Sequence, residues 1–306
     1  IPYKEAMLKY GSDKPDLRNP LLIEDLTTIL SKSTFEPFKT LNIRGIKVDN
    51  IDKSNSWYKK IEEYIKSLGA TGMSYIKVNE DMTFKSSIDK FLTDDLRKEL
   101  IEKCHLNKGS ALFILADNKH KIDKLAGLLR TKLGNELDLI NKNKFEFCII
   151  NDFPMYEYNE EENTWDFGHN PFSMPKGGIE ALTKENMENV VAHQFDFVCN
   201  GYEMASGAVR NHNIEIMKKA FELAGYTEED VENKFRSLYT AFQYGAPPHA
   251  GMAPGIDRIL MLLQDEENIR EMVAFPLGAN GSDQMMGCPN EVFEKQLRET
   301  HIKIRD

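Results

Sequence analysis

Two acidic residues, Asp196 and Glu203, stand on either side of the dipeptide Asn200-Gly201. The residues around them are mainly β-branched and aromatic, and Asn-Gly between such runs is the strongest short-range signal for a two-residue hairpin turn. That turn fixes the strand register and places Asp196 opposite Ala205. The two acids then lie on one face as diagonal neighbours, about 7–8 Å apart at the backbone.

Two carboxylates at that separation cannot touch, but a hard cation between them could bind both. Mg²⁺ held by one or two carboxylates together with substrate phosphates is the ordinary arrangement at nucleotide sites. The alternative is a solvent-facing hairpin whose acids align by chance. Because short motif matches carry a high false-positive rate, this stretch by itself favours the alternative, and the rest of the chain has to decide.

A second candidate lies at the start of an apolar helix expected from about Gly255. Arg258 falls in the first turn of that helix, where a cation opposes the helix dipole, so a purely structural arginine is a poor choice there. An anionic ligand would repair the mismatch, since the helix N-terminus and the guanidinium would both face it. His169, in a loop stiffened by Pro171 and Pro175, is a weaker candidate, because a lone histidine is more often structural.

The composition is that of a globular protein, with 306 residues, 41% of them apolar and 29% charged. No apolar run approaches the roughly 18 residues of a membrane span, so we expect no membrane segment. The four cysteines show no C-x-x-C spacing, which indicates reduced thiols in a cytoplasmic protein and no structural zinc. The net charge of −10 disfavours nucleic-acid binding over the whole surface but allows a local basic patch. Because Ile1 opens directly into a helical pattern, we expect a fragment.

Short strands and helices alternate from residue 30 to residue 142, which predicts a compact α+β module inserted in a larger domain. The expected strands of this part are 41–48, 73–78 and 111–116, and the expected helices are 24–30, 56–68, 93–104 and 119–133, the last one ended by Gly134. Later in the chain we expect a strand at 145–150, a hairpin from 156–158 to 164–167, helices at 213–224 and 228–241, and a final helix from about residue 291.

Several strings of the sequence together resemble the class II aminoacyl-tRNA synthetases, most closely the bacterial-type aspartyl-tRNA synthetases. Their order and spacing agree over essentially the whole chain, and Gly251–Leu263 is similar to the third signature motif of the family. The strings are Y-G-S-D-K-P-D-L-R (Tyr10–Arg18), N-P-F-S-M-P (Asn170–Pro175), F-D-F-V-C-N-G-Y-E (Phe195–Glu203), Arg210 seven residues later, and G-A-P-P-H-A-G-M-A-P-G-I-D-R (Gly245–Arg258).

The resemblance implies an α+β fold: a class II synthetase-like antiparallel sheet flanked by helices, built from residues 1–29 and 143–306, with a GAD-like α+β domain inserted at 30–142. It implies ATP- and Mg²⁺-dependent ligation of L-aspartate to tRNA(Asp) through an aspartyl-adenylate, in a cytoplasmic homodimer, and it leaves open whether tRNA(Asn) is also charged. The anticodon-binding domain and motifs 1 and 2 of the family have no counterpart, so this piece alone is expected to be inactive.

For the nucleotide, the resemblance implies that Asp196 and Glu203 hold Mg²⁺ on the ATP phosphates. The same resemblance assigns ATP contacts to Glu203, Gly255, Asp257 and Arg258, with the guanidinium of Arg258 on the γ-phosphate. Neither step of the reaction needs a nucleophile or another catalytic group from the protein, because positioning and charge neutralisation carry both steps.

For the amino acid, the resemblance implies that Arg210 pairs with the side-chain carboxylate of aspartate, which a planar guanidinium binds in a bidentate way. His169 lies on the loop that closes over the substrate. Strict alternation from Glu203 places Arg210 on the opposite face, so a bulge, expected at Gly207, is required. Many relatives have a second histidine where this chain has Asn170, which puts any role for two histidines in doubt.

Two alternatives remain at this point. A synthetase-like fragment or paralogue could be a non-catalytic binding module, although the retained acids and arginines argue against a degenerate site. An asparagine or lysine ligase is the other alternative. Arg210 opposes it, because an amide or an ammonium group gains nothing from a guanidinium.

Overall fold

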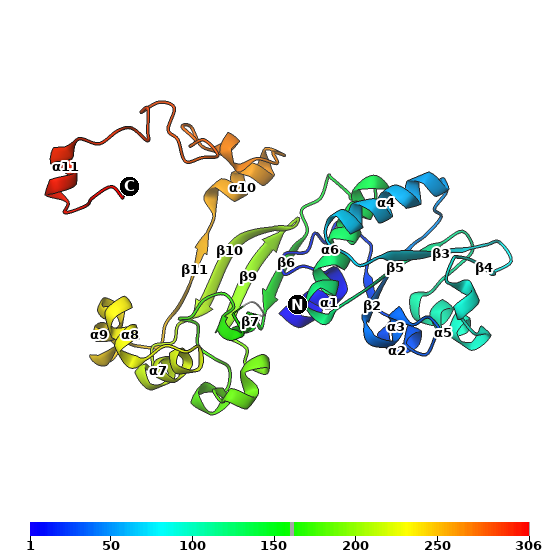
Figure 1. Ribbon diagram of the computed structural model, residues 1–306, viewed down its shortest axis with the longest axis horizontal. Coiled ribbons are helices and arrows are strands. Elements are labelled where there is room, and N and C mark those ends of the chain that lie inside the picture. The colour runs from blue at the N-terminus through cyan, green and yellow to red at the C-terminus, as the bar shows by residue number, and fades with distance from the viewer. Residues whose placement is uncertain (160–161, 306) are drawn as a thin grey trace. The chain divides into compact units, whose positions relative to one another are not determined.

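The computed structural model describes residues 1–159 and 162–305, and the chain forms two compact units, Ile1–Pro254 and Gly255–Asp306 (Figure 1). The first unit contains two larger antiparallel sheets and a two-stranded hairpin, accompanied by helices. This is the predicted α+β fold class. Among the described residues, no helix is both long and apolar enough to cross a bilayer.

The four-stranded sheet, here named the site sheet, is antiparallel throughout, with the strand order β11-β10-β9-β6. Its strands are β6 (Phe147–Asn151), β9 (Gln194–Cys199), β10 (Tyr202–Val209) and β11 (Ala250–Pro254). Asn200 and Gly201 join β9 to β10 with positive φ angles of 52° and 89°, as a type I′ turn requires. The predicted hairpin is therefore confirmed.

The two faces of the site sheet have different surroundings. On one face, Ile150 packs in a small apolar cluster with α1 (Tyr3–Tyr10). On the other face, Phe147 and Ile149 are 55% and 51% exposed. Asp196 pairs directly with Ile150 and therefore lies on the face that α1 covers.

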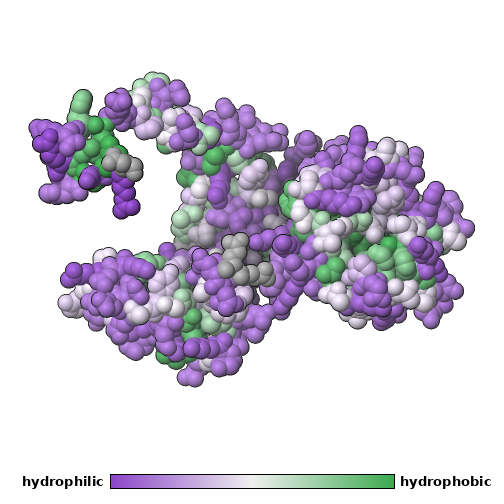
Figure 2. All heavy atoms as spheres, in the orientation of Figure 1, coloured by the Kyte–Doolittle hydropathy of each residue, from purple (hydrophilic) through white to green (hydrophobic). Residues whose placement is uncertain are grey.

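The five-stranded sheet has the order β1-β2-β5-β3-β4 and forms, with its helices, the five-stranded module of residues 23–136. Its central strand is buried on both faces: Phe113 belongs to one hydrophobic cluster and Leu112 to the other. Figure 2 shows apolar residues between the helices, in the area where Figure 1 draws these strands. The strands are β1 (Ile23–Asp25), β2 (Asn42–Val48), β3 (Met73–Val78), β4 (Phe84–Lys85) and β5 (Ala111–Asp117). The helices are α2 (Thr27–Leu30), α3 (Pro37–Thr40), α4 (Asn55–Ser67), η1 (Asp89–Phe91), α5 (Asp94–Cys104) and α6 (Lys119–Glu136).

Two expectations for this module were wrong. The helix expected at 24–30 is instead the strand β1 followed by the short α2, because β1 pairs with β2 and its Ile23 is buried in the core. The helix expected to stop at Gly134 is α6, which continues through this glycine to Glu136. Gly134 serves close packing rather than termination, since a Cβ there would lie 2.3 Å from the Asn19 side-chain nitrogen.

The rest of the first unit follows the predicted order with one break. Asn213 caps α7 by accepting hydrogen bonds from two backbone N–H groups. The helix expected at 228–241 divides at Phe235 into two helices. The predicted hairpin tip includes residues 160–161, which lie outside the described residues. The elements are β7 (Tyr156–Asn159), β8 (Thr164–Phe167), η2 (Gly178–Ala181), η3 (Lys184–Asn189), α7 (Ile214–Leu223), α8 (Glu228–Lys234) and α9 (Arg236–Gln243).

The described residues of the second unit, 255–305, form three short helical elements. The final helix begins three residues later than the expected Glu291, and it is only six residues long. The elements are α10 (Ile256–Leu263), η4 (Ile269–Met272) and α11 (Glu294–Glu299).

Candidate functional site

The register between β9 and β10 shifts by one residue at Met204. Before the shift, Val198 pairs with Glu203 as predicted. After it, Asp196 pairs with Ser206 rather than with Ala205, so this part of the predicted register was wrong. The prediction that both acids lie on one face is confirmed. Glu203 pairs with Val198, and Val198 is two residues from Asp196 on β9, so all three side chains lie on the same face.

The predicted bulge exists, but Gly207 is not its position. Gly207 pairs regularly with Phe195 on one side and Met252 on the other. A Cβ at Gly207 would lie 2.6 Å from the Phe195 ring and 2.7 Å from the Gly251 carbonyl oxygen, so this glycine permits the close approach of both neighbouring strands. The extra residue is Met204, which comes directly after Glu203.

The bulge returns Arg210 to the face of the acids. Alternate positions after Ser206 are 208 and 210, and Ser206 is directly opposite Asp196. Arg210 also forms an isolated antiparallel bridge with Ser173, which continues the ladder past the end of β10. The geometric condition for the predicted role of Arg210 is therefore met.

Two separate motifs converge on Arg210. On one side, the Met174 N–H donates to the Val209 carbonyl at 2.8 Å, which places the loop of the N-P-F-S-M-P string beside β10. On the other side, the Arg210 N–H donates to the His249 carbonyl at 2.9 Å, at the entrance to β11. The Arg210 side chain is half-buried and makes no ion pair with any residue that the structure describes. A guanidinium in that setting is suited to an anionic ligand.

Ser173 adds a polar group that sequence reasoning missed. It is fully buried directly opposite Arg210, and within the described part of the chain its hydroxyl has no hydrogen-bond partner. A buried polar group without a partner costs free energy, so a ligand that reached it would gain a hydrogen bond. The only sequence signal was its place in the N-P-F-S-M-P string.

The carboxylate of Asp196 is held in a defined orientation. It is 3% exposed, and its Oδ1 accepts a hydrogen bond from Ser206 Oγ at 2.7 Å. Burial raises the pKa of Asp196 and the charge of Glu203 adds to this effect, whereas the hydrogen bond from Ser206 and the charge of Lys14 oppose it. Sequence reasoning missed Ser206 because the bulge that brings it opposite Asp196 could not be placed.

Asp196 and Glu203 are here called the acid pair, and Lys14 lies between them. Its Nζ is 3.6 Å from Asp196 Oδ2 and 3.6 Å from Glu203 Oε2, and it also pairs with Asp13. Burial by itself would lower the pKa of Lys14, but the hydrogen bond to Asp13 and the surrounding negative charges outweigh it and raise the pKa. Lys14 was not predicted as a site residue, although it belongs to the Y-G-S-D-K-P-D-L-R string.

The acid pair fits a divalent cation that shares its ligands with a substrate. The described residues contain no group of three or more His, Cys, Asp or Glu side chains suited to a metal, so protein groups alone would not complete a coordination sphere there. Two carboxylates plus phosphate oxygens would do so for Mg²⁺. The Lys14 ammonium between the carboxylates is a direct sign that this position attracts positive charge.

His169 and the residues of α10 occupy defined positions, but their roles stay predictions. The His169 ring packs edge-on against Phe153 with centroids 4.8 Å apart, and its Nε2 is 4.0 Å from a carboxylate oxygen of Glu157. In the second unit, Gly255 is the N-cap of α10, and the Arg258 stem passes over it, 3.7 Å from the position of a Cβ. Asp257 lies in the same first turn.

A sequence model of the family described as "tRNA synthetases class II (D, K and N)" matches residues 1–279. The chain belongs to this family. Among its class II synthetase relatives, the aspartate–tRNA(Asp/Asn) ligase of Ehrlichia chaffeensis is 47% identical over 310 residues, covering 99% of this chain and 52% of the relative. The aspartate–tRNA ligase of Streptomyces coelicolor is 46% identical over 306 residues, covering 100% of this chain and 52% of the relative. The chain thus spans about half the length of the curated relatives it matches.

Solved structures of class II synthetases are also similar to the chain. An aspartyl-tRNA synthetase from Entamoeba histolytica aligns over 77% of this chain and 43% of the solved chain, with 18% identity and a TM-score of 0.33.

Proposed function

We propose that the protein containing this chain ligates L-aspartate to tRNA(Asp) at the expense of ATP. The observation that carries the proposal is the common face of the acid pair and Arg210, created by the bulge at Met204. The sequence identity of 46–47% to relatives named as aspartate–tRNA ligases supports the same choice. The proposed enzyme acts in the cytoplasm as a homodimer, an assembly that rests on the family resemblance.

The proposal gives Arg210 the recognition of the amino acid. Its half-buried guanidinium, which has no ion pair among the described residues, binds the side-chain carboxylate of aspartate through two parallel hydrogen bonds. Ser173 pairs with Arg210 across the backbone, and the proposal gives its buried hydroxyl a hydrogen bond to the same substrate. Asparagine and lysine lack the negative charge that this site requires, so the proposal excludes them as substrates. His169 lies on the loop proposed to close over the bound substrate.

The proposal gives the acid pair the nucleotide end of the site. Asp196 and Glu203 would hold Mg²⁺, which when bound neutralises negative charge on the ATP phosphates. Ser206 keeps one oxygen of Asp196 occupied and leaves Oδ2 turned toward Lys14 and thus toward the metal position. In the second unit, the proposal assigns further ATP contacts to Gly255 and Asp257, and the γ-phosphate to Arg258.

The reaction then needs no protein nucleophile. The α-carboxylate of aspartate attacks the ATP α-phosphate, the bond to the leaving pyrophosphate breaks, and aspartyl-adenylate forms. A ribose hydroxyl of the tRNA next attacks the aspartyl carbonyl, and AMP leaves. Holding the reactants in line and neutralising phosphate charge supply the rate enhancement.

The described sheets also support an assignment of parts. We assign the five-stranded module to a GAD-like domain inserted between two portions of the catalytic domain, 1–29 and 143–306. Because the strand β1 pairs with β2 within the sheet of this module, we propose that the insert begins before Ile23 and that the first catalytic portion is correspondingly shorter than 1–29.

Aspartate-dependent exchange of pyrophosphate into ATP by the full-length protein tests the proposal. We expect exchange with aspartate and none with asparagine or lysine. Exchange driven by either of those amino acids would refute the assignment, and no exchange with any amino acid would favour a non-catalytic binding module. The 306-residue chain by itself is expected to show none.

Charging assays with tRNA(Asp) and tRNA(Asn) then define the acceptor. The Ehrlichia chaffeensis relative is named as a ligase for both tRNAs, which favours tRNA(Asn) as a second acceptor.

A further inference from the structure

The position proposed for a metal ion already holds a cation of the protein itself. Lys14 Nζ is 3.6 Å from the nearer oxygen of Asp196 and 3.6 Å from that of Glu203. These distances are ion-pair distances, but they are longer than a direct hydrogen bond. The ammonium group therefore balances the charge of both carboxylates without a direct hydrogen bond to either of them.

Lys14 also has a second partner outside the acid pair. Its ammonium group is hydrogen-bonded to Asp13, the preceding residue, and the Lys14 N–H donates to Ser12 Oγ at 3.0 Å. If another cation entered between Asp196 and Glu203, Lys14 could remain paired with Asp13. Leaving the acid pair would then not leave a half-buried ammonium group without a counter-charge.

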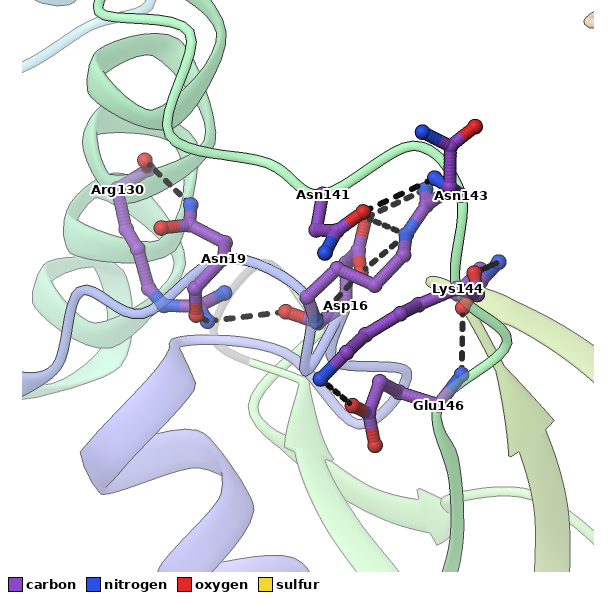
Figure 3. A network of polar contacts seen from close by, with 9 residues as sticks. Asp16, Asn19, Arg130, Asn141, Asn143, Lys144 and Glu146 are labelled. Carbon is purple, nitrogen blue, oxygen red and sulfur yellow. Dashed lines mark hydrogen bonds and ion pairs between the residues drawn. The ribbon is translucent and has the colours of Figure 1, made fainter.

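The loop that carries Lys14 is anchored to the five-stranded module. Arg130 of α6 is 2% exposed and donates from its side chain to the carbonyl oxygens of Asp16 at 3.0 Å, Asn19 at 2.7 Å and Leu21 at 2.6 Å. The Asn19 side chain donates back to the Arg130 carbonyl at 3.0 Å. Figure 3 shows the Arg130 side chain directed at the loop of Asp16 and Asn19.

The same loop also lies close to α6 at Gly11 and close to the β9–β10 turn at Asp16. A Cβ on Gly11 would lie 2.4 Å from the backbone of Gly127 in α6, so these two glycines allow the two backbone segments to touch. At the other side, the Cβ of Asp16 lies 3.5 Å from where a Cβ of Gly201 would be, against the turn of the β9–β10 hairpin. The loop is thus fixed between α6 and the hairpin that carries the acid pair.

We propose that Lys14 is a resident cation of the acid pair, which the first divalent cation must displace toward Asp13, and that Arg130 is the positioning residue that holds the loop of Lys14 in place. The inference rests on the proposed role of Asp196 and Glu203 as metal ligands. Before metal arrives, Lys14 offsets the repulsion of two close carboxylates, one of them buried. Lys14 thereby weakens metal binding, because the metal ion and the ammonium group compete for the same two carboxylates.

Direct metal binding to the full-length protein without nucleotide tests this inference. Mn²⁺ is titrated by calorimetry, and thermal unfolding is followed with Mn²⁺ and with chelator. We expect Lys14→Met to bind Mn²⁺ about tenfold more tightly than the unmodified protein, a coupling of ordinary size for two competing occupants. In chelator the same variant is expected to unfold at a lower temperature than the unmodified protein. Mn²⁺ is expected to raise the unfolding temperature of the variant by more than it raises that of the unmodified protein.

Two control variants separate charge from general damage. Lys14→Arg keeps the positive charge and is expected to keep Mn²⁺ affinity within about twofold. Lys9→Met removes an exposed lysine that pairs with Glu5 on α1, and it is expected to change neither metal affinity nor unfolding. Unchanged or weaker Mn²⁺ binding by folded Lys14→Met would overturn the inference, as would equally tight binding by Lys14→Arg and Lys14→Met.

A further variant distinguishes failure of this inference from failure of the proposed function. Asp196→Asn is expected to weaken Mn²⁺ binding in both the unmodified and the Lys14→Met backgrounds. If Asp196→Asn weakens binding but Lys14→Met has no effect, the acid pair holds metal and the competition by Lys14 is refuted. If Asp196→Asn has no effect in either background, the metal role of the acid pair is itself refuted.

Discussion

The two larger sheets of the first unit use their faces in opposite ways. The central strand of the five-stranded module, β5, pairs in regular register with β2 and β3 and is covered by apolar clusters on both faces. The site sheet has a bulge, a buried aspartate and an arginine at the end of a strand, and it leaves Phe147 and Ile149 more than half exposed on the face opposite α1. A sheet covered on both sides is stabilised by apolar burial on both of its faces, whereas the charged groups on one face of the site sheet reduce the apolar area that this sheet can bury.

This difference predicts that substitutions in the two sheets separate activity from stability. The largest effect on activity is expected for Arg210→Leu in the full-length protein. Loss of a charged partner for the substrate carboxylate is expected to lower kcat/KM for aspartate in the exchange assay by on the order of 10⁴-fold, with unfolding little changed. Arg236→Leu, at an exposed position of α9, is the matched control and is expected to retain activity. An unchanged KM for aspartate in Arg210→Leu would remove the proposed role.

The largest effect on stability is expected in the five-stranded module. Phe113 is fully buried and stacks on Tyr58, with ring centroids 5.6 Å apart. Phe113→Ala is expected to lower the free energy of unfolding by about 3–5 kcal/mol, because it leaves a cavity in a core closed on both sides. Denaturant unfolding measures this loss. If kcat/KM of the remaining folded protein falls more than a few-fold, the two sheets are not as separate as their faces suggest.

A smaller effect is expected from the hydrogen bond that the bulge creates. Ser206→Ala removes the donor to Asp196 Oδ1 and leaves a buried carboxylate oxygen without that partner. We expect a loss of about 1–3 kcal/mol in unfolding free energy, together with weaker Mn²⁺ binding in the absence of nucleotide. Ser74→Ala, in β3 of the other sheet, is the control for loss of a strand hydroxyl. Wild-type behaviour of Ser206→Ala in both measurements would show that Asp196 needs no orienting partner.

The smallest effect is expected where the two regions meet. Arg130→Lys keeps a positive charge in α6 but cannot reproduce the fork that reaches three carbonyl groups. It is expected to change Mn²⁺ affinity by only a few-fold, in the same direction as Lys14→Met, because the loop stays present but is held less firmly. If Arg130→Lys changes the unfolding temperature but leaves the Mn²⁺ affinity unchanged, Arg130 stabilises the fold without positioning Lys14.

Much of the local structure was predictable because it depends on near neighbours in the sequence. Thr93 begins α5 by accepting a hydrogen bond from the Leu96 N–H, as its type predicts. Strand β3 occupies the predicted residues, and β5 extends one residue beyond them. The predictions failed where packing overrode a local signal. Gly134 reads as a helix stop in the sequence, but its contact with Asn19 makes it an interior packing position of α6.

The sequence by itself determined the turn between the two strands of the site, because a type I′ turn needs positive φ angles at both central residues and Asn200-Gly201 tolerates them. From that turn it also followed that Asp196 and Glu203 share a face. The tertiary structure alone decided where the extra residue of β10 goes, and therefore that Ser206 meets Asp196 and that Arg210 returns to their side. It also decided that Lys14 lies between the acids. Such contacts join residues far apart in the chain, and packing, rather than the preferences of neighbouring residues, brings them together.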